Sequence, residues 1–173
     1  MPYSAGVLLA AVLSIQLPAR TPDVHFTPTR HNIADAMLRL ANVTADDVVY
    51  DLGSGDGRLP IIAAQKYGAR GIGVEIDPRL VELSWRIANE AEVANRVSFI
   101  VGDLFEADLS KATVVTMYLS PSIMKILEPR LRALKPGTPS SRMNSRCRDG
   151  SPTRRSRSMN LNYCCGLFPR AET

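Results

Sequence analysis

The stretch that decides the fold is residues 48–58, which read Val48-Val49-Tyr50-Asp51-Leu52-Gly53-Ser54-Gly55-Asp56-Gly57-Arg58. Its first five residues are mostly apolar and are bounded by turn residues, which predicts a buried strand of a parallel sheet. Three alternating glycines then lead into a helical pattern. Glycine permits positive φ and has no Cβ, so a ligand can lie against the backbone amides at the start of the helix. A tight turn needs one glycine, and three exceed that need.

The segments around this stretch alternate between helical and strand patterns. Apolar residues at helical spacing predict helices from Ile33 to about Asn42, from Leu59 to Tyr67 with Gly68 as its cap, and from Asp77-Pro78 to about Ala91. Short apolar runs predict strands at 71–75, 97–101 and 113–118. Such alternation implies right-handed crossovers, so we predict one α/β domain with a doubly wound, mostly parallel sheet.

Carboxylates lie at or just after the ends of three predicted strands: Asp51 near the end of the first, Glu75 at the end of the second and Asp103 after the third. Ligands of doubly wound sheets bind outside the carboxyl ends of the strands, where these acids would meet. Glu75 lies 22 residues beyond Gly53, close to the spacing at which an acid accepts hydrogen bonds from ribose hydroxyls. Asp103 can accept from an adenine amino group. One such acid is a common surface feature, whereas three at three strand ends indicate a binding site.

The glycine loop suits a cationic ligand better than a diphosphate. Dinucleotide sites prefer GxGxxG with amides that face a pyrophosphate, whereas this loop is GxGxG preceded by the carboxylate of Asp51. S-adenosylmethionine carries an ammonium group and a sulfonium and lacks phosphate, so Asp51 favours it over NAD. Glu75 alone does not separate the two ligands, and a nicotinamide-dependent oxidoreductase remains an alternative.

From Asp51 to Asp103 the chain resembles the class I S-adenosylmethionine-dependent methyltransferases, which have a Rossmann-like fold. The resemblance implies roles for seven residues: Asp51, Gly53, Ser54 and Gly55 would contact the methionine end of S-adenosyl-L-methionine, Glu75 the ribose, and Asp103 with the Leu104 amide the adenine. Within that class, Phe26-Thr27-Pro28-Thr29 and the glycine loop resemble small bacterial methyltransferases related to mitochondrial protein-lysine methyltransferases, over residues 24–138. The resemblance implies a methyl acceptor that is a protein lysine or another amine.

The acceptor side is predicted after the strand at 113–118. Tyr118-Leu119-Ser120-Pro121 stands where this fold places residues that line the acceptor channel, and we expect Tyr118 and Pro121 to contact the substrate. A proline in the first turn of a helix also needs no function. The amino-methylation motif Asn-Pro-Pro-Tyr is absent from the sequence. Methyl transfer depends on alignment and water exclusion, so no residue is assigned as a catalytic acid or base.

The sequence after Gly137 departs from the resemblance. Lys135-Pro136-Gly137-Thr138 is similar to the family's turn into a fifth strand, but residues 139–173 are rich in Ser and Arg. This composition predicts disorder and no fifth strand, which would leave the strand at 113–118 as an exposed edge. We hypothesise a reading-frame change near Thr138. A natural basic tail is the alternative for the segment, and a truncated, non-catalytic binding module is the alternative for the whole chain.

Charge and cysteines are also concentrated in this tail. Residues 138–173 carry seven Arg against two acids, a net of +5, so the net charge of +4 leaves −1 for the rest of the chain. We therefore expect no specific nucleic-acid partner. The three cysteines, all in the tail, lack CxxC spacing and histidine neighbours, and no metal site is predicted.

The first 22 residues form an apolar segment ahead of the predicted domain at 23–138. The run from Ala5 to Leu17 is too short to span a bilayer as a helix, and no Lys or Arg precedes it. A cleaved signal peptide, a short helix and a peripheral membrane anchor remain open. Because S-adenosylmethionine is made in the cytosol, we expect a cytoplasmic protein, whether or not it is tethered to a membrane. The sequence does not indicate an oligomeric state.

Overall fold

A computed structural model of the chain describes residues 26–134, 140–143 and 166–167. The apolar segment at 1–22, the cysteines and most of the tail lie outside the described residues, so the predictions about them stay predictions. Among the described helices, none combines the length and the apolar character needed to cross a membrane.

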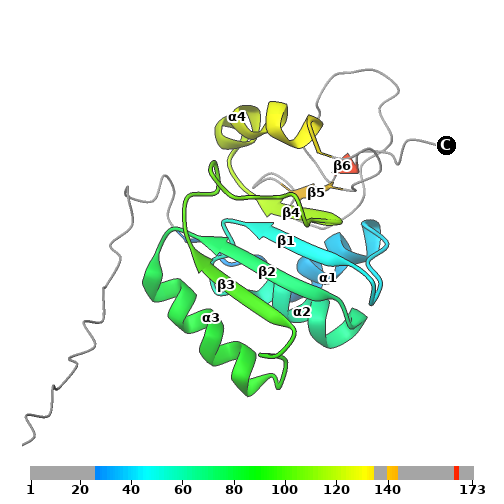
Figure 1. Ribbon diagram of the computed structural model, residues 1–173, viewed down its shortest axis with the longest axis vertical. Coiled ribbons are helices and arrows are strands. Elements are labelled where there is room, and N and C mark those ends of the chain that lie inside the picture. The colour runs from blue at the N-terminus through cyan, green and yellow to red at the C-terminus, as the bar shows by residue number, and fades with distance from the viewer. Residues whose placement is uncertain (1–25, 135–139, 144–165, 168–173) are drawn as a thin grey trace, which may run out of the picture.

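Helices and strands alternate from α1 to β3 as expected, and a loop joins β3 directly to β4 (Figure 1). The helices are α1 (His31–Leu40), α2 (Arg58–Tyr67), α3 (Pro78–Glu90) and α4 (Pro121–Arg132). The strands are β1 (Val48–Leu52), β2 (Arg70–Glu75), β3 (Val97–Val101), β4 (Val114–Tyr118), β5 (Ser140–Met143) and β6 (Gly166–Leu167). From α1 to β4, the predicted ends agree with the observed ones to within one or two residues. The predicted caps also occur, since Gly68 ends α2 with φ +68° and the Asp77 side chain accepts from the Arg79 amide at the start of α3.

The strands form one sheet in the order β3-β2-β1-β4-β5-β6. Neighbouring strands from β3 to β5 are parallel, and β6 is antiparallel to β5. The order along the chain reverses between β1 and β4, which makes this boundary the switch point of a doubly wound sheet. The predicted α/β fold class is confirmed.

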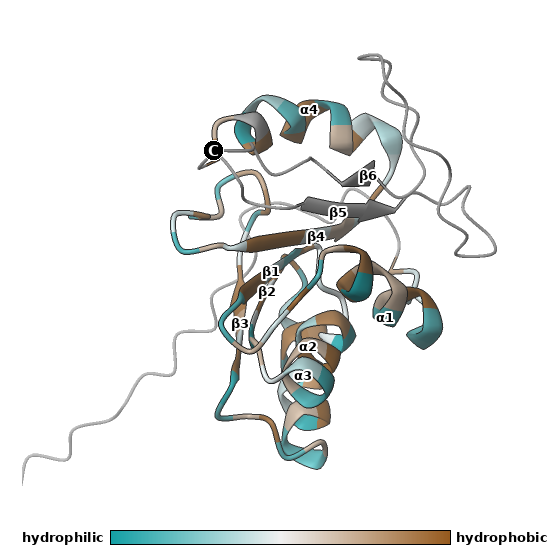
Figure 2. Ribbon diagram, turned by 90° about the vertical axis from the view of Figure 1, so that its right-hand side faces the viewer, coloured by the Kyte–Doolittle hydropathy of each residue, from teal (hydrophilic) through white to brown (hydrophobic). Residues whose placement is uncertain are grey.

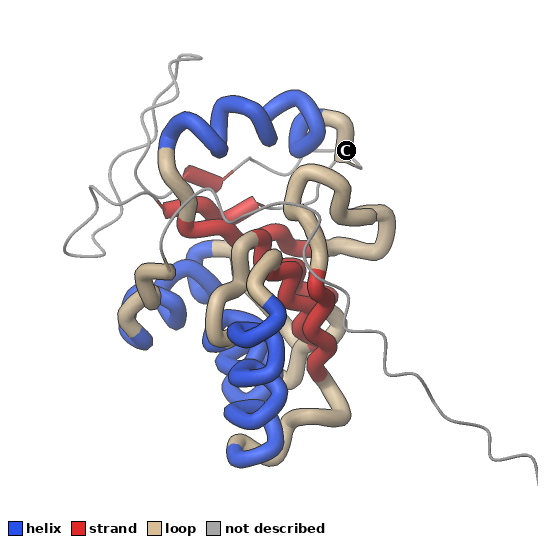
Figure 3. Tube along the Cα trace, turned by 90° about the vertical axis from the view of Figure 1, so that its left-hand side faces the viewer, coloured by secondary structure: helices blue, strands red, loops and turns tan. Residues whose placement is uncertain are grey.

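The two faces of the sheet build separate cores because side chains alternate along each strand. Val49 of β1 packs with α1 and α2, whereas its neighbours Tyr50 and Leu52 pack with α4 on the opposite face. The helix α3 joins α2 over β3 through a third cluster, which includes Phe99. Figure 2 shows α1, α2 and α3 together on one side of the apolar strands and α4 on the other, and Figure 3 shows the same division from the opposite side. These layers leave the carboxyl ends of the strands accessible for a ligand.

The prediction that no strand follows β4 was wrong. Residues 140–143 form β5, which pairs with β4 in parallel from Val115↔Ser140 to Tyr118↔Met143. The Ser/Arg-rich composition gave the wrong expectation because strand pairing uses backbone N–H and C=O groups, which Ser140, Ser141 and Arg142 supply as well as apolar residues do. The strand β4 is therefore paired on both sides. The proposed change of reading frame concerns the coding DNA and stays a hypothesis.

Candidate functional site

A cleft of about 810 Å³ opens at the carboxyl ends of β1, β2, β3 and β4. Its walls include all seven residues expected to bind the cofactor and one of the two expected to contact the substrate: Asp51, Gly53, Ser54, Gly55, Glu75, Asp103, Leu104 and Tyr118. The expectation that three strand-end carboxylates meet at one cleft is confirmed. Pro121 is exposed at the first turn of α4 and is not part of the wall, although Ser120 and Ile123 on either side of it are.

The glycine loop uses the conformational freedom of its glycines. Gly53, Gly55 and Gly57 have φ of +73°, +57° and +73°, a region that residues with a Cβ rarely adopt. Gly55 is required for space as well, because a Cβ built on it would lie 2.4 Å from Cε2 of Phe26. The loop therefore depends on glycine both for its path and for its contact with an aromatic ring.

Groups from distant parts of the chain hold Gly55 on both sides. Its amide donates a hydrogen bond of 2.9 Å to Oε2 of Glu75. Its carbonyl accepts from Oγ of Ser84, a fully buried residue of α3, at 3.1 Å. Because both polar groups of Gly55 are paired within the protein, the loop is held in place before any ligand binds.

Asp51 is a buried carboxylate, with only 3% of its surface exposed. Its Oδ1 accepts a hydrogen bond of 2.7 Å from Oγ1 of Thr116 on the neighbouring strand β4. Burial raises the pKa of Asp51 to about 7; the bond from Thr116 opposes this effect, and the charges of Glu75 and Asp56 add to it. The described residues form no ion pair with Asp51, so a cation in the cleft would find an uncompensated acid there.

Glu75 supports the backbone more extensively than the sequence suggested. Beyond its bond to Gly55, its Oε1 accepts from the amides of Ile76 and Asp77 at 2.8 and 3.0 Å. A carboxylate oxygen can accept two hydrogen bonds, so Oε2 keeps capacity for one further donor, such as a ribose hydroxyl. Glu75 is therefore fixed in position where a ribose contact is expected.

Two other expected cofactor residues have contrasting environments. The hydroxyl of Ser54 is buried and has no hydrogen-bond partner among the described residues, which is unusual for a buried polar group. Oδ1 of Asp103 accepts from the Phe105 amide at 2.8 Å, which fixes the turn that follows β3. Leu104, which stands between Asp103 and Phe105 in the chain, lines the same cleft.

An N-terminal strap formed by Phe26, Thr27, Pro28 and Thr29 also lines the cleft. The guanidinium of Arg58 attaches this strap to the glycine loop, because its Nη1 donates to the Thr29 carbonyl while Nε and Nη2 bind the Asp56 carboxylate. The hydrogen bond to Asp56 raises the pKa of Arg58 above its usual value. The sequence motif singled out this strap, but nothing in its pattern revealed the attachment through Arg58.

The residues fit S-adenosylmethionine as a ligand. Asp51 is a buried acid that forms no ion pair within the described part of the chain, which suits the cationic amino-acid end of the ligand. The glycines allow close approach, and the Ser54 hydroxyl, which also has no partner among those residues, lies in the same wall. Glu75 and Asp103 follow at the ends of the next strands, in the order that a ribose and an adenine would require.

The region that contains this cleft is similar to known methyltransferases. The family model of the ANTKMT methyltransferase domain matches residues 51–139. A protein-lysine N-methyltransferase of Saccharolobus islandicus is 41% identical over 119 residues, which cover 68% of this chain and 74% of the relative. The adenine nucleotide translocase lysine N-methyltransferase of Mus musculus is 38% identical over 87 residues, or 50% of this chain, and the matched region spans only 38% of that relative's length.

A solved structure is similar over the same region. The crystal structure of an RNA methyltransferase from Salinibacter ruber in complex with S-adenosyl-L-homocysteine has a TM-score of 0.67 and 52% sequence identity, covering 74% of this chain and 84% of the other. The comparisons favour a methyl donor over the nicotinamide alternative. The chain belongs to the family of the ANTKMT methyltransferase domain, within the class I S-adenosylmethionine-dependent methyltransferases.

Proposed function

We propose that this protein transfers a methyl group from S-adenosylmethionine to the ε-amino group of a lysine in another protein. The observation that carries the proposal is the meeting of the glycine loop and three strand-end acids in one cleft, in a chain of this family. The Saccharolobus islandicus relative described as a protein-lysine N-methyltransferase supports lysine as the acceptor.

The chemistry is a displacement at carbon. When bound, S-adenosylmethionine supplies a methyl group on a positively charged sulfur: a neutral amine forms the new N–C bond as the C–S bond breaks, S-adenosylhomocysteine leaves, and the nitrogen releases a proton to water. The protein's part is to orient the two reactants and to exclude water. Asp51 would attract the amino-acid end, Glu75 and Asp103 would fix the nucleoside, and Tyr118 would form one wall of the acceptor channel.

Charge favours an ammonium over a phosphate at this cleft. Its walls carry five acids, namely Asp51, Asp56, Glu75, Asp77 and Asp103, and two arginines. Both arginines are already paired, Arg58 with Asp56 and Arg79 with Asp77. Such walls attract a lysine side chain and repel the phosphates that accompany a nucleotide acceptor.

An RNA acceptor is the second candidate, because the similar Salinibacter ruber structure is described as an RNA methyltransferase. A labelling experiment separates the two. The full chain is incubated with S-adenosylmethionine carrying tritium in its methyl group and with a bacterial extract, half of which has been treated with RNase and half with protease. We expect label in the RNase-treated half, recovered as methyl-lysine after acid hydrolysis. Label only in the RNA of the protease-treated half would overturn the lysine acceptor.

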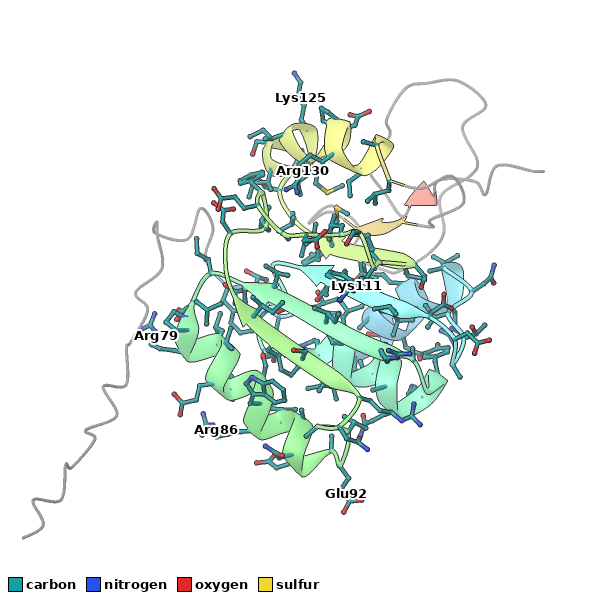
Figure 4. All side chains as sticks on the ribbon, viewed as in Figure 1. Arg79, Arg86, Glu92, Lys111, Lys125 and Arg130 are labelled. Atoms are coloured by element: carbon teal, nitrogen blue, oxygen red, sulfur yellow. The ribbon has the colours of Figure 1, made fainter. Side chains whose placement is uncertain are left out.

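Two variants test whether the labelling comes from this cleft. Asp51→Asn removes the charge expected to hold the methyl donor and should abolish most labelling. Lys125→Gln is the control, because Lys125 is exposed on α4 and points away from the body of the molecule (Figure 4). Labelling that survives Asp51→Asn unchanged would place the donor elsewhere.

A further inference from the structure

The aromatic ring of Phe26 lies directly against the glycine loop. A Cβ built on Gly55 would come within 2.4 Å of Cε2 and 2.9 Å of Cδ2 of this ring, so the two residues are in contact across 29 positions of sequence. Phe26 keeps 45% of its surface exposed and lines the cleft. Part of the ring is therefore available to a ligand that rests on the loop.

The strap that carries Phe26 is attached to the loop by a planar, charge-assisted link. Asp56 belongs to the loop, and Nε of Arg58 donates to its Oδ1 at 2.8 Å. The same guanidinium donates to the carbonyl of Thr29, a residue only 8% exposed, three positions after Phe26. Arginine is suited to this link because its planar guanidinium can donate to a carboxylate and a carbonyl at the same time, which fixes the two groups relative to each other.

This arrangement places an aromatic ring and a buried acid in the walls of one cleft. Asp51 lines it at the end of β1, and Phe26 covers the loop that follows. A cation near an aromatic face is attracted by the ring quadrupole, and the attraction increases where water is excluded. The sulfonium of S-adenosylmethionine is a permanent cation, whereas the thioether of the product S-adenosylhomocysteine is neutral.

We infer that Phe26 recognises the charged sulfur of the methyl donor, and that Arg58 is a positioning residue that holds Phe26 over the site through the Thr29 carbonyl. The inference rests on the proposed placement of the donor's methionine end at the glycine loop. The ring would favour the charged donor over the neutral product and so would assist product release. This role of Phe26 would also explain why the strap lies against the glycine loop.

The test is the ratio of two affinities, measured by calorimetry on the full chain with S-adenosylmethionine and with S-adenosylhomocysteine. Phe26→Leu keeps an apolar side chain and removes the ring, so we expect the donor to lose about three- to tenfold more affinity than the product loses. Phe26→Tyr keeps the ring and should keep the ratio of the original protein. Arg58→Lys keeps the positive charge but lacks the planar fork, and it should shift the ratio in the same direction as Phe26→Leu.

Ile126→Ala serves as the matched control, because Ile126 is an exposed apolar residue of α4 with 63% of its surface accessible, outside the cleft wall. Thermal unfolding of each variant shows whether the fold is retained, which we expect because Phe26 is only half-buried. Equal weakening of donor and product in Phe26→Leu would mean that the ring only covers the site, and would overturn the inference while leaving the proposed function intact. Failure of the original protein to bind either ligand would overturn both.

Discussion

Replacing Asp51 by Asn should raise the free energy of unfolding of the ligand-free protein and lower its affinity for the ligand. Asp51 is buried, and its pKa is raised to about 7 from an ordinary value of 3.8. The folded state therefore binds one more proton than the unfolded state between about pH 4 and 7, and the free energy of unfolding falls as the pH rises through this window. Above pH 7 the loss is complete.

The magnitude follows from the pKa difference of about three pH units. At about 1.4 kcal/mol for each unit, the ionised Asp51 costs the folded state about 4 kcal/mol at pH 8 and about 2 kcal/mol at pH 5. Asparagine is neutral at every pH, and its side-chain oxygen can still accept the hydrogen bond from Thr116. We therefore expect Asp51→Asn to raise the melting temperature at pH 8 by an amount on the order of 10 °C, with the gain fading toward pH 4.

The assay is urea unfolding of both proteins from pH 4 to 8, with ligand affinity measured on the same samples. At pH 8 the variant should bind S-adenosylhomocysteine about ten- to a hundredfold more weakly, the range expected for a lost charged hydrogen bond. Asp108→Asn is the control, because Asp108 is an exposed acid whose pKa is lowered by hydrogen bonds from Ser110, and it should give no gain at pH 8. A stability gain in Asp51→Asn that does not vary with pH would show that the ionisation of Asp51 does not destabilise the fold.

Two further substitutions probe the same cleft, and a third probes the packing of α2 on β2. Thr116→Val removes the hydrogen bond that opposes the raised pKa of Asp51, so the pH midpoint of S-adenosylhomocysteine binding should move upward. An unchanged midpoint in a pH titration of binding would contradict this. Gly55→Ala should weaken ligand binding about tenfold or more in calorimetry. The reason is that the added Cβ would lie 2.4 Å from the ring of Phe26 and that the φ of Gly55 is positive. An affinity equal to that of the original protein would contradict the observed position of the strap. Gly71→Ala should lower the free energy of unfolding, measured by urea denaturation, by about 1–3 kcal/mol, because the added Cβ would lie 2.6 Å from the Pro60 carbonyl oxygen. An unchanged free energy of unfolding would show that the backbone of α2 can move.

Local sequence patterns were sufficient for the elements that form the site. The apolar run Val48–Leu52 and the glycines after it define a strand and a turn by short-range chemistry, and β1 occurs where it was expected. The three acids could be placed together because strand ends of a parallel sheet share one edge. The doubly wound, mostly parallel sheet could therefore be predicted once the alternation of helices and strands was recognised, whereas the strand order was not predicted.

Contacts between residues far apart in the chain could not be predicted from local sequence patterns. Thr116 binds Asp51 because β4 lies beside β1 in a register that pairs the two residues, and no local pattern records that register. The contact of Phe26 with Gly55 and the attachment of Thr29 to Arg58 depend in the same way on how the strap crosses the loop. The Ser/Arg-rich sequence also gave no sign of β5, since backbone pairing does not require apolar side chains.

A crystal structure of this protein with S-adenosylhomocysteine would test the assigned ligand site directly. We expect the amino-acid end of the ligand beside Asp51 and the glycine loop, the ribose hydroxyls within hydrogen-bond distance of Glu75, and the adenine next to Asp103 and Leu104. A ligand bound outside this cleft, or one whose ribose and adenine do not approach Glu75 and Asp103, would contradict this assignment.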